Sequence, residues 1–202
     1  MIEPTVFITF AYLLGAFPTA YILGKLFYVK DITQLGNRNV GTVNAWREFG
    51  WKTGIAVLII DMMKGAIVMA LILILGASEM IAFAAAIAVT LGHNFSVFLK
   101  FEGGKGAAVV LGLSLVILPM LTILAMLTIP IVYRFTRSVV WSFLMSIIIL
   151  NLLIILTGQP ASQVGLCITL GLVVIATHIW RTRKDFIVAI RTLDFARLGQ
   201  VE

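Results

Sequence analysis

The sequence predicts an all-α integral membrane protein with seven transmembrane helices, a single membrane-embedded domain over residues 1–202. Composition, apolar runs and the placement of basic residues predict it. Of 202 residues, 61% are hydrophobic and 12% are charged, whereas soluble domains average roughly 45–50% apolar and about 25% charged. A soluble domain of this size could not bury so much apolar surface. The one cysteine, Cys167, excludes an internal disulfide.

The apolar runs define the spans. A transmembrane helix needs about 20 apolar residues, and five runs meet this length: 5–27, 54–76, 79–99, 138–157 and 161–180. A sixth run, 107–133, would form a helix about 40 Å long, which exceeds a hydrocarbon core of about 30 Å. Pro119 lies near its middle and favours a break. We therefore predict two short helices, the fourth and fifth, joined near Pro119, in a locally thinned bilayer.

The basic residues predict the orientation. With seven spans, fourteen of the fifteen lysines and arginines fall on one face, and only Lys64 lies inside a span. The opposite face holds Glu3, Glu79 and the turn at 158–162. The positive-inside rule assigns the basic face to the cytoplasm. The N-terminus is then outside and the C-terminus cytoplasmic. The start of the chain lacks the basic region of a cleaved signal peptide, so none is expected.

The first polar segment on the basic face is 28–53. Its stretch 36–44 is rich in glycine and asparagine, which favour turns and positive φ. Backbone N–H groups, amides and the guanidinium groups of Arg38 and Arg47 suit a phosphate or carboxylate ligand. The alternative is an ordinary polar turn facing anionic headgroups.

The second polar segment combines Gly92-His93-Asn94-Phe95 with the glycine turn at 103–106. The glycines lead into a predicted helix beginning near Ala107. Free N–H groups at a helix start, beside Lys105, are typical of an anion site. His93 could serve as a base or hold a substrate hydroxyl. The alternative is a histidine hydrogen-bonded at a helix end.

The third segment, 134–141, and the tail at 181–202 are basic. The tail pattern is amphipathic and predicts a helix on the anionic leaflet rather than chemistry. Within the second span, Asp61 and Lys64 lie three residues apart on one helical face. Because intramembrane charges are costly, we expect a paired arrangement, as a structural tie or a proton path. His93 and His178 are the only histidines, so no metal site or cofactor is expected.

These residues resemble the PlsY family, the bacterial acyl-phosphate:glycerol-3-phosphate acyltransferases. The likeness covers nearly the whole chain, and its most specific part is 92–106. The other matching segments are 15–18, 36–50, 58–65, the arginine after the fifth span and the basic end of the chain.

The resemblance implies a multi-pass enzyme of the bacterial cell membrane with a cytoplasmic active face. It would transfer a fatty acyl group from acyl phosphate to glycerol 3-phosphate, or a related acceptor, and give lysophosphatidate for phospholipid synthesis. Membrane lipids and other lipid-synthesis proteins are the expected partners, with no nucleic acid. The implied catalytic residues are His93, Lys105 and Arg47. The implied substrate-binding residues are Gly36, Asn37, Asn39, Gly41, Asn44, Gly103, Gly104, Gly106, Arg137 and Arg183.

Several motif positions differ from the family pattern. Small hydroxyl, amide and glycine positions are the ones most often replaced, by Asn37, Arg38, Val43, Ser96, Glu102, Val109, Val140, Thr182 and Asp185. Two other functions therefore stay open: a non-catalytic member that binds lipid phosphates or a protein partner, and a transporter or channel. A transporter would carry polar groups along several spans, whereas here nearly all of them lie at one face.

Overall fold

A computed structural model describes the backbone of residues 3–192 and side chains as far as Arg183. The described residues are helical, without a β-strand. The chain divides into two compact units, residues 1–119 and 120–202. The last ten residues of the predicted surface helix, 193–202, lie outside the described residues.

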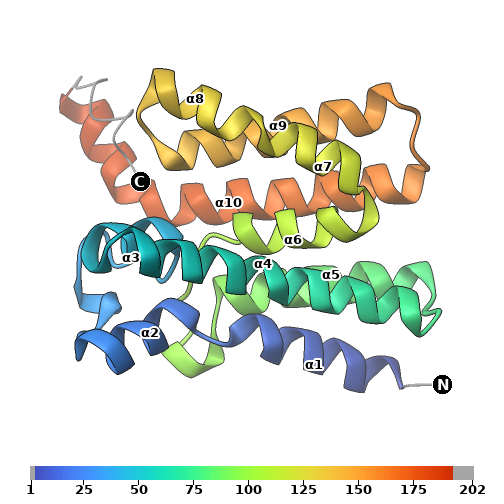
Figure 1. The fold of residues 1–202 in the computed structure, drawn as a ribbon, viewed down its shortest axis with the longest axis horizontal. Helices are drawn as coiled ribbons and strands as arrows, with labels where there is room; N and C mark the ends of the chain where they lie inside the picture. The colour runs from blue at the N-terminus through green and yellow to red at the C-terminus, as the bar shows by residue number, and fades with distance from the viewer. Residues whose placement is uncertain (1–2, 193–202) are drawn as a thin grey trace. The chain divides into compact units, whose positions relative to one another are not determined.

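The first unit begins with a broken helix. Helix α1 (Pro4–Ala16) and helix α2 (Thr19–Tyr28) are bent by about 40° at Phe17–Pro18, where the proline lacks a backbone donor. The run 5–27 is thus an interrupted span, a break that the sequence analysis did not predict. A loop with the 3₁₀ helix η1 (Ile32–Gln34) then leads to helix α3 (Thr42–Phe49). In Figure 1, α2 and α3 lie at the end of this unit away from the start of α1.

Three longer helices complete the first unit. They are α4 (Trp51–Ile74), α5 (Glu79–Asn94) and α6 (Ala107–Ile117), and the loop before α6 contains the 3₁₀ helix η2 (Val97–Leu99). Ser78 is the N-cap of α5, and its hydroxyl accepts a hydrogen bond from the Ile81 N–H, as expected of an N-cap serine.

Glycines let the helices of this unit approach closely. A Cβ on Gly15 or Gly92 would overlap a backbone carbonyl across the α1–α5 crossing. A Cβ on Gly65 or Gly112 would do the same across the α4–α6 crossing. Small residues are the usual means of close helix packing in membranes. These two crossings fix the ends of α5 and α6, which carry the candidate site.

The second unit contains α7 (Pro119–Met126, beginning at the unit boundary), α8 (Thr128–Thr136), α9 (Val139–Leu156) and α10 (Ala161–Thr192). In Figure 1, α8 and α9 form a helical hairpin and α10 lies alongside α9. The Ser138 side chain caps α9 by accepting from the Trp141 N–H. Helix α10 runs through the start of the predicted surface helix without a break.

The predicted break in 107–133 is confirmed, because α6 ends at Ile117 and α7 begins at Pro119. Helix α6 is short, with 11 residues. Its successor is longer than expected, since α7 and α8 together give an apolar segment of 18 residues, Pro119–Thr136.

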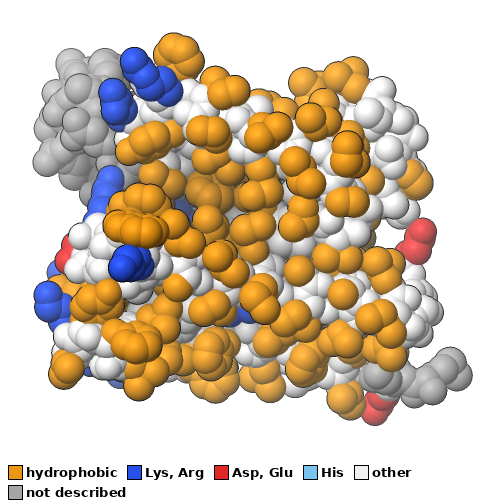
Figure 2. All heavy atoms as spheres, viewed as in Figure 1, with side chains coloured by type: hydrophobic (Ala, Val, Ile, Leu, Met, Phe, Trp, Pro, Cys, Tyr) orange, Lys and Arg blue, Asp and Glu red, His pale blue; other side chains and the backbone are white. Residues whose placement is uncertain are grey.

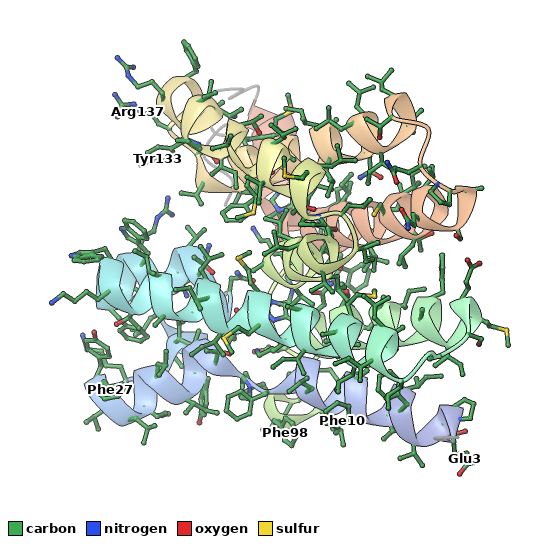
Figure 3. All side chains as sticks on the ribbon, turned by 45° about the vertical axis from the view of Figure 1, so that its right-hand side comes forward. Glu3, Phe10, Phe27, Phe98, Tyr133 and Arg137 are labelled. Carbon is green, nitrogen blue, oxygen red and sulfur yellow. The ribbon has the colours of Figure 1, made fainter. Side chains whose placement is uncertain are left out.

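Four helical segments in the described part of the chain are long and apolar enough to cross a membrane, and the bent α1–α2 pair would make a fifth. The seven-span count and the orientation remain predictions. Figure 2 shows apolar side chains over much of the visible face. In the first unit, Figure 3 places Glu3 at one end and Phe27 near the other, and several basic side chains of this unit lie in Figure 2 at the end formed by α2 and α3.

Candidate active site

The glycine turn before α6 lies directly on His93. The Gly104 N–H donates to the His93 carbonyl oxygen over 3.0 Å, and a Cβ on Gly104 would overlap Nε2 of the imidazole. A Cβ on Gly103 would overlap the same carbonyl. His93 is buried near the end of α5, where the preceding Gly92 lies against α1. Only glycine therefore allows the turn to contact the ring.

Asp61 on α4 lies on the other side of the imidazole. Its Oδ1 is 3.8 Å from Nδ1 of His93. The same oxygen accepts from Nζ of Lys64 at 2.6 Å and from the Thr19 hydroxyl at 2.9 Å. Asp61 and Lys64 are 2% and 3% exposed, so the expected pairing is confirmed as a buried ion pair.

The ion pair also holds the break between α1 and α2. Nζ of Lys64 donates to the Phe17 carbonyl oxygen at 2.6 Å, which satisfies a group released by the break. Ser96 donates to the carbonyl oxygen of Ala16. These contacts surround a small cavity lined by Ala16, Phe17, Pro18, Thr19, Val40, Asp61, Lys64, His93, Ser96, Leu99 and Gly103.

Lys105 and Gly106 connect the turn to α6. Lys105 is half-buried and its Nζ is shielded from solvent. Gly106 has φ +87°, a value that favours glycine, and its carbonyl accepts the first helical bond from Val110. The first N–H groups of a helix have no partner within it, so the turn delivers a cation and backbone donors to one place.

The glycine- and asparagine-rich loop 36–44 is organised from within. Asn44 is buried, and its Nδ2 donates to the carbonyl oxygens of Leu35 and Asn39 at 3.0 and 3.1 Å. Asn37 accepts from the Asn39 N–H at 3.0 Å through its side chain. Gly36 has φ +53°, and a Cβ there would overlap the Asn44 side chain. The amide of Asn44 therefore shapes the loop.

The two loops meet at one backbone hydrogen bond, from the Val40 N–H to the Gly103 carbonyl oxygen at 3.4 Å. Gly41 follows as the N-cap of α3. Arg47 lies six residues farther along the chain, on α3, and is exposed, as is Arg38. The structure thus joins the loops and leaves the two guanidinium groups at the surface of this unit.

Arg137 and Arg183 belong to the second unit. Arg137 is exposed at the end of α8, with φ +55°; Figure 3 shows it near Tyr133. Arg183 is exposed on α10 and lies over the Trp180 ring, 4.0 Å from its centroid. Their part in substrate binding remains a prediction.

Sequence reasoning did not assign Asp61, Lys64, Thr19 or Ser96 to the site. The two charges within an apolar span were the available signal, but their partner across the fold, His93, is 32 positions from Asp61 in sequence. Thr19 and Ser96 carried no signal of their own. Both become recognisable only after the α1–α2 break is known.

A second ion pair lies at the edge of the same unit. Nζ of Lys25 is 3.3 Å from Oδ2 of Asp31. Hydrogen bonds from Thr33, aided by Lys25, hold the pKa of Asp31 below its ordinary value. Within the described residues, no three histidine, cysteine or acidic side chains converge as metal ligands.

Comparisons with known proteins agree on one family. A family model described as glycerol-3-phosphate acyltransferase matches residues 5–191. Glycerol-3-phosphate acyltransferase 4 of Dehalococcoides mccartyi is 39% identical over 186 residues, which cover 90% of this chain and 98% of that protein. Glycerol-3-phosphate acyltransferase of Enterococcus faecalis is 36% identical over 142 residues, which cover 70% of this chain and 65% of that protein.

Two solved structures have the same fold. Both are crystal structures of PlsY (YgiH), described as an integral membrane glycerol 3-phosphate acyltransferase. The glycerol 3-phosphate form gives a TM-score of 0.82 at 28% identity, covering 94% of this chain and 92% of that one. The lysophosphatidic acid form gives 0.79 at 26% identity, with the same coverage.

Proposed function

This chain belongs to the glycerol-3-phosphate acyltransferase family, and we propose that it transfers a fatty acyl group from acyl phosphate to glycerol 3-phosphate at the cytoplasmic face of the bacterial membrane. The product is lysophosphatidate, for phospholipid synthesis. The observation that carries the proposal is the glycine turn on His93, which leads through Lys105 into α6. Such a turn supplies the donors that an acyl phosphate needs.

The reaction needs little covalent chemistry from the protein. The glycerol hydroxyl oxygen bonds to the acyl carbon, the bond from that carbon to the phosphate oxygen breaks, and inorganic phosphate leaves with the bonding electrons. The hydroxyl proton passes to a base or to the departing phosphate. Because phosphate is a good leaving group, no acyl-enzyme is required. Positioning of the substrates and stabilisation of developing negative charge supply most of the rate.

The residues of the first unit divide between these tasks. Lys105 and the N–H groups of Gly103 and Gly106 would bind phosphate, and His93 would orient the turn and the reacting hydroxyl. Gly104, whose N–H donates to the His93 carbonyl oxygen, would hold the turn against the imidazole. Asn39, Gly41, Asn44 and Arg47 would form the facing wall, together with Gly36 and Asn37. The backbone bond between Val40 and Gly103 supports a shared site for the two loops.

A non-catalytic lipid-phosphate-binding or partner-binding role is not favoured, because the relative from Dehalococcoides mccartyi, matched over 98% of its length, carries an enzyme name. A contribution from other lipid-synthesis proteins stays a prediction.

The purified protein in nanodiscs tests the function directly. With acyl phosphate and glycerol 3-phosphate, lysophosphatidate should accumulate together with an equal amount of inorganic phosphate. Omission of glycerol 3-phosphate should leave only background hydrolysis. Phosphate release without lysophosphatidate would show hydrolysis of acyl phosphate by water and would reject glycerol 3-phosphate as the acceptor. No turnover, under conditions where a relative from this family is active, would reject the proposal.

A further inference from the structure

We propose that Asp61 is a positioning residue for the acyl transfer, and that it acts by holding the His93 imidazole beneath the glycine turn that binds acyl phosphate. The inference rests on the proposed function and deepens it. It assigns the buried charge in α4 to the chemistry of the turn, in addition to its role in joining helices.

The geometry forms a line from carboxylate to turn. Oδ1 of Asp61 faces Nδ1 of His93 at 3.8 Å, and the opposite ring nitrogen, Nε2, faces Gly104. At this separation the contact is electrostatic rather than a direct hydrogen bond. A carboxylate on this side favours the neutral tautomer whose N–H is at Nδ1 and opposes rotation of the ring. Any rotation of the ring would therefore move the surface on which Gly104 rests.

Lys64 and Thr19 hold the carboxylate in place. Both donate to the same oxygen, at 2.6 and 2.9 Å, and each is attached to a different helix. Lys64 is one helical turn along α4, and Thr19 begins α2 immediately after the break. The Asp61 carboxylate is therefore held by donors from two helices, α4 and α2, on the side of the His93 imidazole.

The competing explanation is that the ion pair only ties helices together. Lys64 does link α4 to the Phe17 carbonyl, so loss of stability after a single substitution would not distinguish the two roles. Removal of both charges together distinguishes the structural role from the positioning role. A buried ion pair can often be replaced by uncharged residues of similar volume without loss of stability, whereas removal of one partner leaves an uncompensated charge.

The test compares Asp61→Asn with the double variant Asp61→Asn/Lys64→Gln in nanodiscs, because glutamine is uncharged and keeps a donor for the Phe17 carbonyl oxygen. Melting temperature, kcat, KM for acyl phosphate and the ¹⁵N resonances of His93 are measured for each. The protein has two histidines, so His178→Gln identifies the signal of His93. Asp31→Asn, the same substitution in the partly exposed Lys25–Asp31 pair, is the matched control.

We expect Asp61→Asn to lower both the melting temperature and kcat/KM. The double variant should regain the melting temperature, yet its kcat/KM should stay on the order of 10–100-fold below wild type, with altered His93 resonances. Asp31→Asn should retain wild-type kcat/KM. Asp61→Glu, which keeps the charge but displaces the carboxylate, should fold and still be impaired.

Recovery of both stability and kcat/KM in the double variant would overturn the inference, because the pair would then be structural. Unchanged His93 resonances and full activity in Asp61→Glu would overturn it as well. An inactive wild type would instead reject the proposed function. In that case the His93 resonances of the variants still decide whether Asp61 orients the imidazole.

Discussion

At the residue scale, the candidate site depends on two glycines in the turn before α6, because neither has a Cβ atom. His93 and the turn approach so closely because Gly103 and Gly104 lack a Cβ. The ring is buried, and Oδ1 of Asp61 lies 3.8 Å from Nδ1 on its far side. A rigid ring below the turn keeps the backbone N–H groups in one arrangement, which is the condition for binding an anion without reorganisation.

Gly104→Ala should therefore impair catalysis, because the added Cβ must displace either the imidazole or the turn. We expect a fall in kcat/KM on the order of 100-fold and a higher KM for acyl phosphate. Gly165→Ala is the control, since a Cβ there meets no atom within 4 Å. Steady-state kinetics of both variants check the prediction; equal activity would show that the turn does not need this contact.

Lys105→Ala should abolish binding of acyl phosphate while the fold is retained. The half-buried ammonium lies beside the start of α6, where its charge adds to the helix dipole. Lys100→Ala, an exposed lysine in the same loop, should bind as the wild type does. Equilibrium binding of a non-hydrolysable acyl phosphonate measures both. Equal affinities in the two variants would exclude Lys105 from the anion site.

At the element scale, the crossing of α4 and α6 determines where the Asp61–Lys64 ion pair lies relative to the glycine turn before α6. A Cβ on Gly112 would overlap the Met62 carbonyl, and one on Gly65 would overlap the Val109 carbonyl. The same α4 turn region carries Asp61 and Lys64. Separation of these helices would therefore move the ion pair away from the turn that precedes α6.

Gly112→Ala should destabilise the protein by about 1–3 kcal/mol, the usual range for overpacking, because the clash is with backbone and no side chain can move aside. Gly165→Ala, in an uncrowded helical position, should be neutral or slightly stabilising because alanine is the better helix former. Denaturant unfolding in detergent compares them. An unchanged midpoint for Gly112→Ala would show that the crossing is looser than described.

The elements also show how far the sequence alone could reach. Pro119 predicted the break between α6 and α7, because a run too long for the bilayer contained a helix breaker. Pro18 gave no such signal, since its run had an ordinary length for a span. The glycine turn and His93 were recognisable by composition. The approach of His93 to Asp61 was not recognisable, because it depends on the α1–α5 and α4–α6 crossings.

At the scale of the whole molecule, the distribution of charge implies an orientation. The first unit carries Glu3 and Glu79 at the outer ends of α1 and α5, and most of its basic residues belong to α2, α3 and the loops that meet at Gly103. The positive-inside rule then predicts that the loops proposed to bind phosphate face the cytoplasm, where soluble glycerol 3-phosphate would reach them.

Cysteine labelling can test this orientation and the span count together. In a Cys167→Ala background, Glu79→Cys should react with a membrane-impermeant maleimide on spheroplasts, whereas Lys52→Cys, at the start of α4, should react only after permeabilisation.

The same labelling tests the number of spans. Lys100→Cys and Arg134→Cys flank the segment broken at Pro119. If α6 and the α7–α8 segment cross separately, both cysteines are protected. If 107–133 crosses once, they lie on opposite sides, and only one is protected. That result would leave six spans and reverse the predicted side of every element from α8 onward.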